Sequence, residues 1–204
     1  MKRRGILLLL CLPAAFACAD TLYGTQAPKD TAFVRVFRAV DGGGPVEVGA
    51  RRFDPPRGGV TPYRPVLPDI YLLSAGGQEL ELIPRVRRYY TLALTAEGWL
   101  VFEDVEHTDP ARAQLVLYDL LPGQKVELKT EDGRTVVVAA VGPGEAGRVN
   151  VNPVPVRLGV FGSAGKLVAI GDPGLRRGAS YSVFVFPGRS AVEALCARAE
   201  LAQE

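Results

Sequence analysis

The sequence predicts an all-β protein made of two tandem β-sandwich domains of the immunoglobulin-like kind, followed by a short C-terminal helix. Short runs that alternate apolar and polar residues recur along the chain, which is typical of half-buried strands. Clusters of Gly, Pro and Asp, such as residues 41–45 and 74–77, separate these runs at the even spacing of a sandwich. A polar segment at residues 106–111 divides the runs into two groups, so we expect two domains.

Residues 1–19 have the features of a cleavable signal peptide. Residues 2–4 are basic, residues 6–12 are apolar, and Ala17-Cys18-Ala19 is a small-x-small cleavage site. The apolar run is shorter than the roughly 20 residues that a bilayer requires. We therefore expect a Sec-exported protein whose mature chain is soluble.

The same leader permits a second interpretation, in which Cys18 becomes the lipidated first residue of a lipoprotein. We favour ordinary cleavage after Ala19, because Ala17 and Ala19 match that signal. Cleavage there removes Cys11 and Cys18 and leaves Cys196 as the only cysteine of the mature chain. No intramolecular disulfide can then form, although the compartment is an oxidising one.

The charge balance argues against a nucleic-acid partner. The whole chain has 24 basic and 22 acidic residues, and the leader contains three of the basic residues and no acid. The mature chain therefore has a net charge near −1, with arginines and acids interleaved. Nucleic-acid binding requires basic residues gathered on one face, and we expect no such partner.

Six candidate strands make up the N-terminal sandwich, residues 20–105. They are residues 33–39, 46–53, 70–73, 80–83, 89–95 and 99–102. After the linker at residues 106–111, seven candidates make up the C-terminal sandwich, residues 112–190. They are residues 114–120, 125–129, 135–141, 148–151, 156–161, 167–170 and 180–186. Asp132-Gly133 between two of these predicts a hairpin, since the turn needs a positive φ that Gly tolerates.

The two groups of strands resemble each other, which favours two related domains. Residues 33–37 followed by 45–48 are similar to residues 115–118 followed by 125–128. Further on, residues 86–94, which contain arginines followed by a strand-like run, are similar to the residues after position 175. A strand–turn–strand pattern shared by all sandwiches explains the likeness equally well.

The C-terminal tail, residues 191–204, is the one segment with a helical composition. Its first turns carry apolar residues at the spacing of one helix face. These residues are Val192, Leu195, Ala199 and Ala202. Cys196 lies beside this stripe, and we expect it to pack against the second sandwich rather than to react.

Ester transfer requires an activated nucleophile, so a catalytic reading needs a Ser or Cys with a base and an orienting acid. His107 is the only histidine, and Asp104 precedes it in an Asp-x-x-His pattern. No serine lies in the Gly-Asp-Ser context that accompanies this pattern in ester hydrolases; the serines are Ser74, Ser163, Ser180, Ser182 and Ser190. A polar linker explains His107 better, so we predict no enzyme activity and no catalytic residue.

The sequence predicts neither a metal site nor a cofactor. One histidine and one mature cysteine cannot complete a zinc shell. The aspartates that could bind calcium are scattered one per turn, which suits local turn hydrogen bonds. The glycine-rich segments at residues 42–44 and 142–144 have no following helix that would hold a phosphate.

Two features could contact a polysaccharide. Arg85, Arg87 and Arg88, together with the arginines at positions 51, 52 and 64, could meet an acidic polymer. Trp99 could hold a sugar ring, although large aromatic residues more often contribute buried area. The candidate polymer contacts are therefore Arg85, Arg87, Arg88 and Trp99, against the alternative of a solvated strand face and a packed Trp.

The start of the mature chain is similar to a known family. Leu22-Tyr23-Gly24, Ala27-Pro28-Lys29 and Phe33-Val34-Arg35-Val36-Phe37 follow the leader, and Tyr89-Tyr90-Thr91-Leu92 and Asn152-Pro153-Val154 come later. The order and spacing of these motifs resemble those of the alginate biosynthesis protein AlgF family. The members of this family are periplasmic accessory proteins of exopolysaccharide O-acetylation. The resemblance runs from about residue 22 to about residue 161, apart from residues 51–68, which have no clear counterpart in the family, and it fades beyond residue 161.

The resemblance implies a non-catalytic adaptor required for O-acetylation of alginate or of an alginate-like or cellulose-type polymer. Such a protein acts with periplasmic O-acetyltransferases and a membrane-bound acyl donor protein, and docks these components to one another. The candidate partner contacts lie in the turn-rich start of the mature chain: Leu22, Tyr23, Gly24, Pro28 and Lys29. The alternative is a carbohydrate-binding module that presents an anionic polysaccharide to the acetyltransferase.

Overall fold

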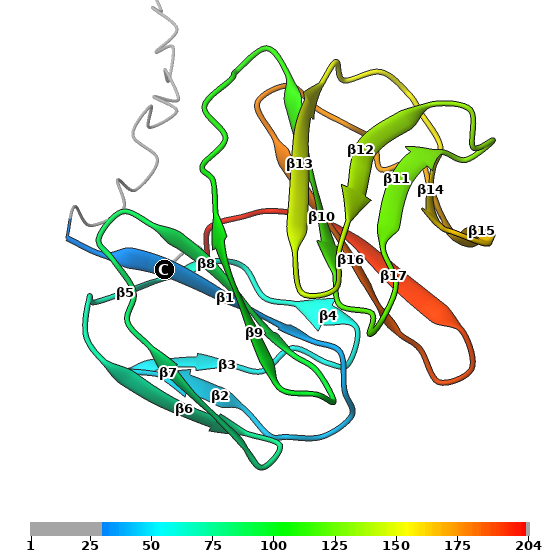
Figure 1. Cartoon of the computed structure of the whole chain (residues 1–204). Coiled ribbons are helices and arrows are strands. Elements are labelled where there is room, and N and C mark those ends of the chain that lie inside the picture. The colour runs from blue at the N-terminus through cyan, green and yellow to red at the C-terminus, as the bar shows by residue number, and fades with distance from the viewer. Residues whose placement is uncertain (1–29, 203–204) are drawn as a thin grey trace, which may run out of the picture.

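The computed structural model describes residues 30–202, which form strands, turns and coil. No helix is present among these residues, and 17 strands follow one another along them. The strands of residues 32–104 form a first half, and those of residues 113–198 form a second half beside it (Figure 1). The all-β expectation is confirmed. The expected signal peptide lies outside the described residues.

The first half folds from nine strands. They are β1 (Ala32–Arg38), β2 (Val46–Val48), β3 (Arg51–Phe53), β4 (Gly59–Val60), β5 (Arg64–Val66), β6 (Tyr71–Ala75), β7 (Gln78–Leu82), β8 (Tyr89–Leu94) and β9 (Trp99–Asp104). β4 and β5 pair with one side of β1, β8 pairs with its other side, and β9 pairs with β8. The hairpins β2–β3 and β6–β7 pack against this sheet, with Val34, Val36, Phe53 and Leu73 in the first core.

The second half folds from eight strands. They are β10 (Ala113–Asp119), β11 (Val126–Thr130), β12 (Val136–Val141), β13 (Ala146–Val151), β14 (Leu158–Gly162), β15 (Gly165–Gly171), β16 (Ser180–Pro187) and β17 (Val192–Arg198). One sheet has the order β13-β10-β16-β17 and the other β12-β11-β14-β15. Leu115 and Val183 from the first sheet pack with Leu128 and Val160 from the second in one core, so this half is a β-sandwich.

The two halves repeat one arrangement of strands. β1 pairs in parallel with β8, and β10 pairs in parallel with β16. β9 and β17 then pair antiparallel with β8 and β16, respectively. The sequence similarity between residues 33–37 and residues 115–118 therefore falls on strands that occupy corresponding positions.

The expected C-terminal helix is wrong, because residues 192–198 form strand β17. This strand pairs antiparallel with β16, from Val192 opposite Pro187 to Arg198 opposite Tyr181. Pairing provides partners for backbone groups of β16 that would otherwise lack them, and it outweighs the weak helical preference of a short segment. Cys196 packs against the second core as expected, but from a strand.

The segment at residues 46–53, expected as one strand, is a hairpin. β2 ends at Val48 and β3 begins at Arg51, because the chain turns at Gly49, whose φ is 57°. The Arg-, Pro- and Gly-rich residues that follow contain β4 and β5, which have no alternating pattern of their own. Both strands exist because they pair with β1.

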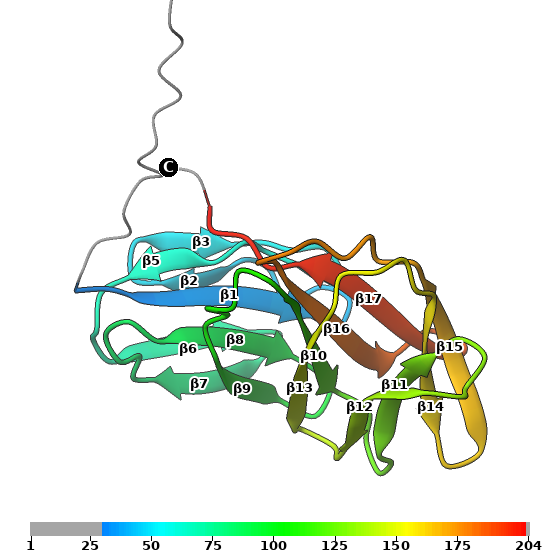
Figure 2. The same ribbon diagram turned by 90° about the horizontal axis from the view of Figure 1, so that it is seen from above.

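A third core joins the halves. β1 is buried along its whole length, because one face covers the first core and the other faces the second half. Phe37 stacks on Phe184 with ring centroids 4.3 Å apart, and Phe184 stacks on Tyr118 at 4.6 Å. Figure 2 shows the second half packed against the first. The two halves therefore form one body.

Candidate functional site

A cleft of about 230 Å³ lies where the two halves meet. Its walls come from β1, from the segment between β9 and β10, from the start of β16, and from the residues around the end of β17. The polar side chains in it include Arg35, Asp104, His107, Gln114 and Ser182. Because it gathers groups that could perform or assist chemistry, we treat this cleft as the candidate functional site.

Arg35 is a charged residue in the middle of a buried strand. Its neighbours on β1 face the first core, so alternation along the strand directs Arg35 toward the second half. The side chain is 2% exposed. Its Nε donates to Thr91 Oγ1 at 2.8 Å, and its Nη2 donates to Ser182 Oγ at 2.8 Å and to Tyr118 OH at 3.0 Å.

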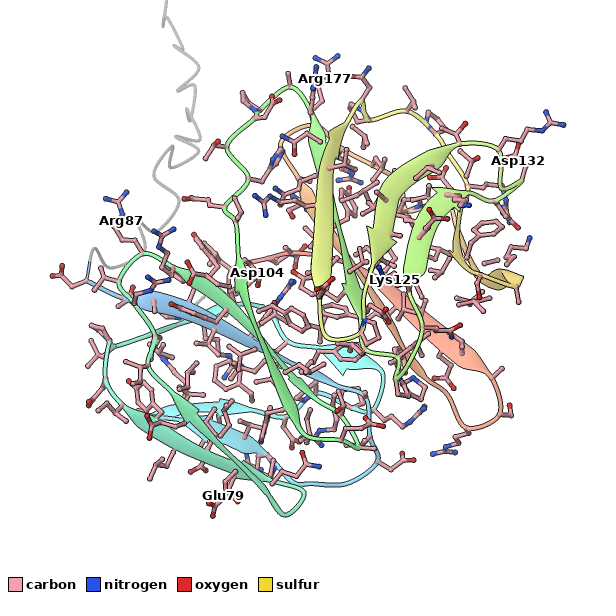
Figure 3. All side chains as sticks on the ribbon, in the orientation of Figure 1. Glu79, Arg87, Asp104, Lys125, Asp132 and Arg177 are labelled. Carbon is pink, nitrogen blue, oxygen red and sulfur yellow. The ribbon has the colours of Figure 1, made fainter. Side chains whose placement is uncertain are left out.

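Asp104 ends β9 and supplies the matching negative charge. Its carboxylate accepts hydrogen bonds from the hydroxyls of Thr91, Tyr118 and Tyr63, the last at 2.7 Å. Its Oδ2 lies 4.0 Å from Arg35 Nη2. The hydroxyls of Thr91 and Tyr118 bridge the two charges, since each accepts from Arg35 and donates to Asp104. Figure 3 shows Asp104 at the junction of the halves.

The surroundings keep Arg35 charged and the tyrosine hydroxyls of this network protonated. Burial alone would lower the pKa of Arg35, but the nearby Tyr118, Tyr63 and Asp104 raise it, so the guanidinium keeps its proton. Burial raises the pKa values of Tyr63 and Tyr118, so their hydroxyls stay protonated and can donate. A buried ion pair adds little net stability, but breaking it is costly. The network therefore disfavours any packing that separates the halves.

The cleft also brings Ser180 and Ser182 together with His107, which the sequence did not predict. Each of these groups is bonded elsewhere. His107 Nε2 lies 2.9 Å from the carbonyl oxygen of Arg112, and Ser180 Oγ donates to Gln114 Oε1 at 2.9 Å. A carbonyl can only accept, so Nε2 carries the proton. Within residues 30–202, no hydrogen bond joins a serine to His107.

Sequence reasoning missed Arg35 and Tyr118 as members of this network. One signal could have found Arg35. Residues 33, 34, 36 and 37 are apolar, which places apolar side chains on both faces of the strand, and a strand buried on both faces must also bury its arginine. No local signal distinguishes Tyr118 from an ordinary core aromatic residue.

The structure separates the predicted polymer contacts. Arg85, Arg87 and Arg88 lie in the loop just before β8, whereas Trp99 begins β9 at the opposite end of the β8–β9 hairpin. A six-residue strand spans roughly 17–20 Å, so these groups do not form one patch. Trp99 packs against the first core, and its Nε1 donates to the carbonyl oxygen of Gln78 at 3.4 Å. It also borders a second cleft between the halves, whose other wall comes from the second half.

The expected partner contacts, Leu22, Tyr23, Gly24, Pro28 and Lys29, lie outside the described residues. Within the part of the chain that the structure describes, no group of three or more His, Cys, Asp or Glu side chains is arranged to hold a metal ion. The same part contains no helix that is long and apolar enough to cross a membrane.

Most of the chain matches one known family. Residues 5–182 match the family described as alginate O-acetyl transferase AlgF. The chain belongs to the AlgF family. Among AlgF relatives, the alginate biosynthesis protein AlgF of Pseudomonas aeruginosa is 34% identical, over 84% of this chain and 80% of its own length. The protein of the same name from Pseudomonas putida is 30% identical, over 84% of this chain and 80% of its own length.

A solved structure from the AlgF family is also similar to this chain. The C-terminal domain of AlgF from P. aeruginosa shares 31% sequence identity, with a TM-score of 0.40. The similarity covers 43% of this chain and 98% of that domain. The family match confirms the resemblance carried by the sequence motifs, and it connects the chain to a family of alginate O-acetylation.

Proposed function

We propose that this AlgF-family protein is a non-catalytic periplasmic adaptor required for O-acetylation of alginate or a related exopolysaccharide. In this role it docks periplasmic O-acetyltransferases to one another and to a membrane-bound acyl donor protein. The names of the family and of its relatives support the pathway. The observation that carries the adaptor role is the cleft between the halves, whose candidate nucleophile, base and acid are all held in structural hydrogen bonds.

Acyl transfer requires a nucleophile whose proton a base can accept. Ser180 donates its proton to a glutamine instead, and Ser182 is buried and accepts from a guanidinium. His107 donates its Nε2–H to a backbone carbonyl, and among the described residues no serine hydroxyl is hydrogen-bonded to the imidazole ring. Asp104, which could orient the histidine, already accepts from three hydroxyls. These contacts support a protein that holds other components rather than one that carries the acetyl group.

The shared core between the halves supports the same role. Because Phe37, Tyr118 and Phe184 pack the halves together, the sheet edges of both halves keep fixed positions. Strands such as β9 and β15 lie at the ends of their sheets, and an edge strand presents backbone groups that a partner strand can join. One body can thus hold two partners at a set distance.

The direct test is a capture experiment with residues 20–204 as bait. The prey are the periplasmic domains of acetyltransferases encoded in the same genome, with acetylated and deacetylated polymer tested in parallel. We expect the bait to capture an acetyltransferase and no polymer. Capture of polymer alone would instead assign a carbohydrate-binding module, and the adaptor role would have to be withdrawn.

The variant His107→Ala separates an adaptor from an enzyme. We expect unchanged acetylation of the polymer in cells and an unchanged melting temperature, because His107 is partly exposed and bonds only to the backbone of Arg112. Loss of acetylation in a folded His107→Ala protein would mean that the cleft is catalytic. Chemical analysis of acetyl groups on the purified polymer gives the readout.

A further inference from the structure

Half of the large apolar side chains that the described residues expose lie at one end of the first half. Leu72 is 82% exposed, and four more aliphatic residues lie at the ends of β5, β6 and β7 that meet there. We call this set the apolar tip; its members are Leu67, Ile70, Leu72, Ile83 and Val86. The tip lies at the end of the first half that is remote from the second half (Figures 1 and 2).

Strand alternation indicates that the side chains of the apolar tip do not belong to the hydrophobic core. In the β6–β7 hairpin, Leu73 and Leu82 turn inward and are buried, whereas Leu72 and Ile83 turn outward. Farther along the same outward face the chain is polar, as at Glu79, which is usual for a sheet with one face in water. Apart from Glu81, which lies directly opposite Leu72, the exposed aliphatic side chains gather at one end of this face, and such a gathering points to a binding surface.

Three arginines border the tip in the loop between β7 and β8. Arg85 and Arg88 both pair with the single carboxylate of Glu103. Arg87 has no ion pair among the described residues, and its side chain points away from the protein (Figure 3). Its φ is 60°, which is unfavourable for a residue other than Gly. This conformation is held because the Arg87 N–H donates to the carbonyl oxygen of Thr31 at 2.7 Å.

We propose that the apolar tip docks this protein on the surface of a lipid bilayer that contains anionic lipids. The aliphatic side chains then lie among the acyl chains, and the three arginines lie at the headgroup phosphates, as in other interfacial binding surfaces. Asp69 and Glu81 are also exposed at this end. Attraction to the headgroups is therefore modest, and insertion of the aliphatic side chains contributes most of the binding.

One observation favours a bilayer over a protein partner. The five exposed side chains of the tip are Leu, Ile and Val, and Leu and Val are under-represented among the energetic centres of protein interfaces.

The test is cosedimentation of residues 20–204 with vesicles of phosphatidylethanolamine and phosphatidylglycerol, and with vesicles of phosphatidylcholine alone. We expect binding to the anionic vesicles that weakens in high salt, and less binding to the neutral ones. The double variant Ile70→Ser/Leu72→Ser should lower the partition coefficient about ten-fold or more. A matched control, Val136→Ser/Val154→Ser, changes side chains of the second half that are 50% and 55% exposed, and it should bind as the parent protein does.

The variant Arg87→Asn separates charge from apolar insertion, because Asn tolerates a positive φ. It should weaken binding to the anionic vesicles about five-fold and leave binding to the neutral ones unchanged. The proposal is overturned if the parent protein binds neither kind of vesicle, or if the control variant loses as much binding as the tip variant.

Other occupants of the tip give different results. If the tip variant keeps its vesicle binding but no longer captures an acetyltransferase domain, the tip is a protein interface and the proposal is overturned. Loss of a dimer in light scattering, with vesicle binding unchanged, would assign the tip to a second copy of this chain and overturn it equally. The adaptor role is tested by capture without lipid, so its outcome is independent of the vesicle result.

Discussion

Arg35 and Asp104 place a charged pair where the second half has none. In the registers of the parallel pairs β1–β8 and β10–β16, Arg35 on β1 occupies the position that Val116 occupies on β10. Each of these two residues lies between two core residues. The position of Asp104 corresponds to Ala199, just after β17. The first half therefore supplies both charges, and the second half contributes hydroxyl groups. The ion pair therefore lies within the first half, and its hydrogen bonds to the hydroxyl groups of the second half reach across the junction.

The variant Asp104→Ala should lower the free energy of unfolding by about 3–5 kcal/mol. It leaves the buried guanidinium of Arg35 without its carboxylate and removes the acceptor of three hydroxyls. Urea unfolding followed by the fluorescence of Trp99 measures the loss. The control Arg189→Ala breaks an exposed ion pair with Asp41 and should cost less than about 1 kcal/mol. Equal losses would mean that the network does not stabilise the junction.

Asp119 makes stability depend on pH. Its side chain is fully buried at the end of β10; Oδ1 accepts the N–H of Leu121 at 3.0 Å, and Oδ2 has no partner among the described groups. Burial raises the pKa of Asp119 to about 6, with Glu145 adding to the shift and the Leu121 N–H opposing it. The folded protein thus holds this proton more tightly than the unfolded chain, so stability decreases as the pH rises from about 4 to about 6.

The variant Asp119→Asn should remove this pH dependence. At about pH 7 the parent protein buries a carboxylate that the variant lacks, so the variant should be more stable by about 3 kcal/mol. Near pH 3 the carboxyl is protonated in both the folded and the unfolded chain, and the difference should vanish. Melting temperatures of the two proteins between about pH 3 and about pH 8 test the prediction. A gap that widens toward low pH would contradict it.

Among the elements, β17 shows how tertiary pairing decides the structure of a short segment. Ala194 and Cys196 contact the second core, and Leu195 between them contacts the third core. A strand sends alternate side chains to opposite faces, so one strand can serve two cores. A helix in this place would present a single apolar stripe and leave the edge of β16 without its partner.

Labelling of Cys196 tests whether β17 stays in place. Burial raises the pKa of this thiol to about 11, so the reactive thiolate is about 100-fold scarcer than for an exposed cysteine. We expect iodoacetamide to modify the folded chain of residues 20–204 about 100-fold more slowly than the same chain in urea. A second cysteine from Ser190→Cys, in the exposed turn before β17, should react at the rate of a free thiol. Fast labelling of Cys196 would mean that β17 detaches.

The strands predicted from the sequence are those with an apolar pattern of their own, such as β1 and β16. The hairpin at Asp132-Gly133 is confirmed, since β11 and β12 pair antiparallel across a turn in which Gly133 has a φ of 75°. β4 and β5 are two and three residues long, too short for a pattern. The pairing of these two strands with β1 makes them strands, and no local signal encodes it.

For the whole molecule, the third core couples the unfolding of the two halves. Phe184→Ala removes a ring that stacks on both Phe37 and Tyr118, and it should lower stability by about 3–5 kcal/mol. The parent protein should melt in a single calorimetric transition, whereas the variant should show two. The control Val160→Ala creates a cavity within the second core alone and should keep one transition. Two transitions in the parent would mean that the halves are not coupled.

The sequence by itself determined the fold class, the position of most strands and the family, because alternation, turn residues and ordered motifs are local properties of the chain. Only the tertiary structure decided that the tail is a strand and that Arg87 and Trp99 lie at opposite ends of a hairpin. It also decided the candidate site, in which Arg35 bonds to residues 56, 83 and 147 positions away along the chain. Contacts at such separations depend on how the two halves pack, and no local pattern of residues specifies that packing.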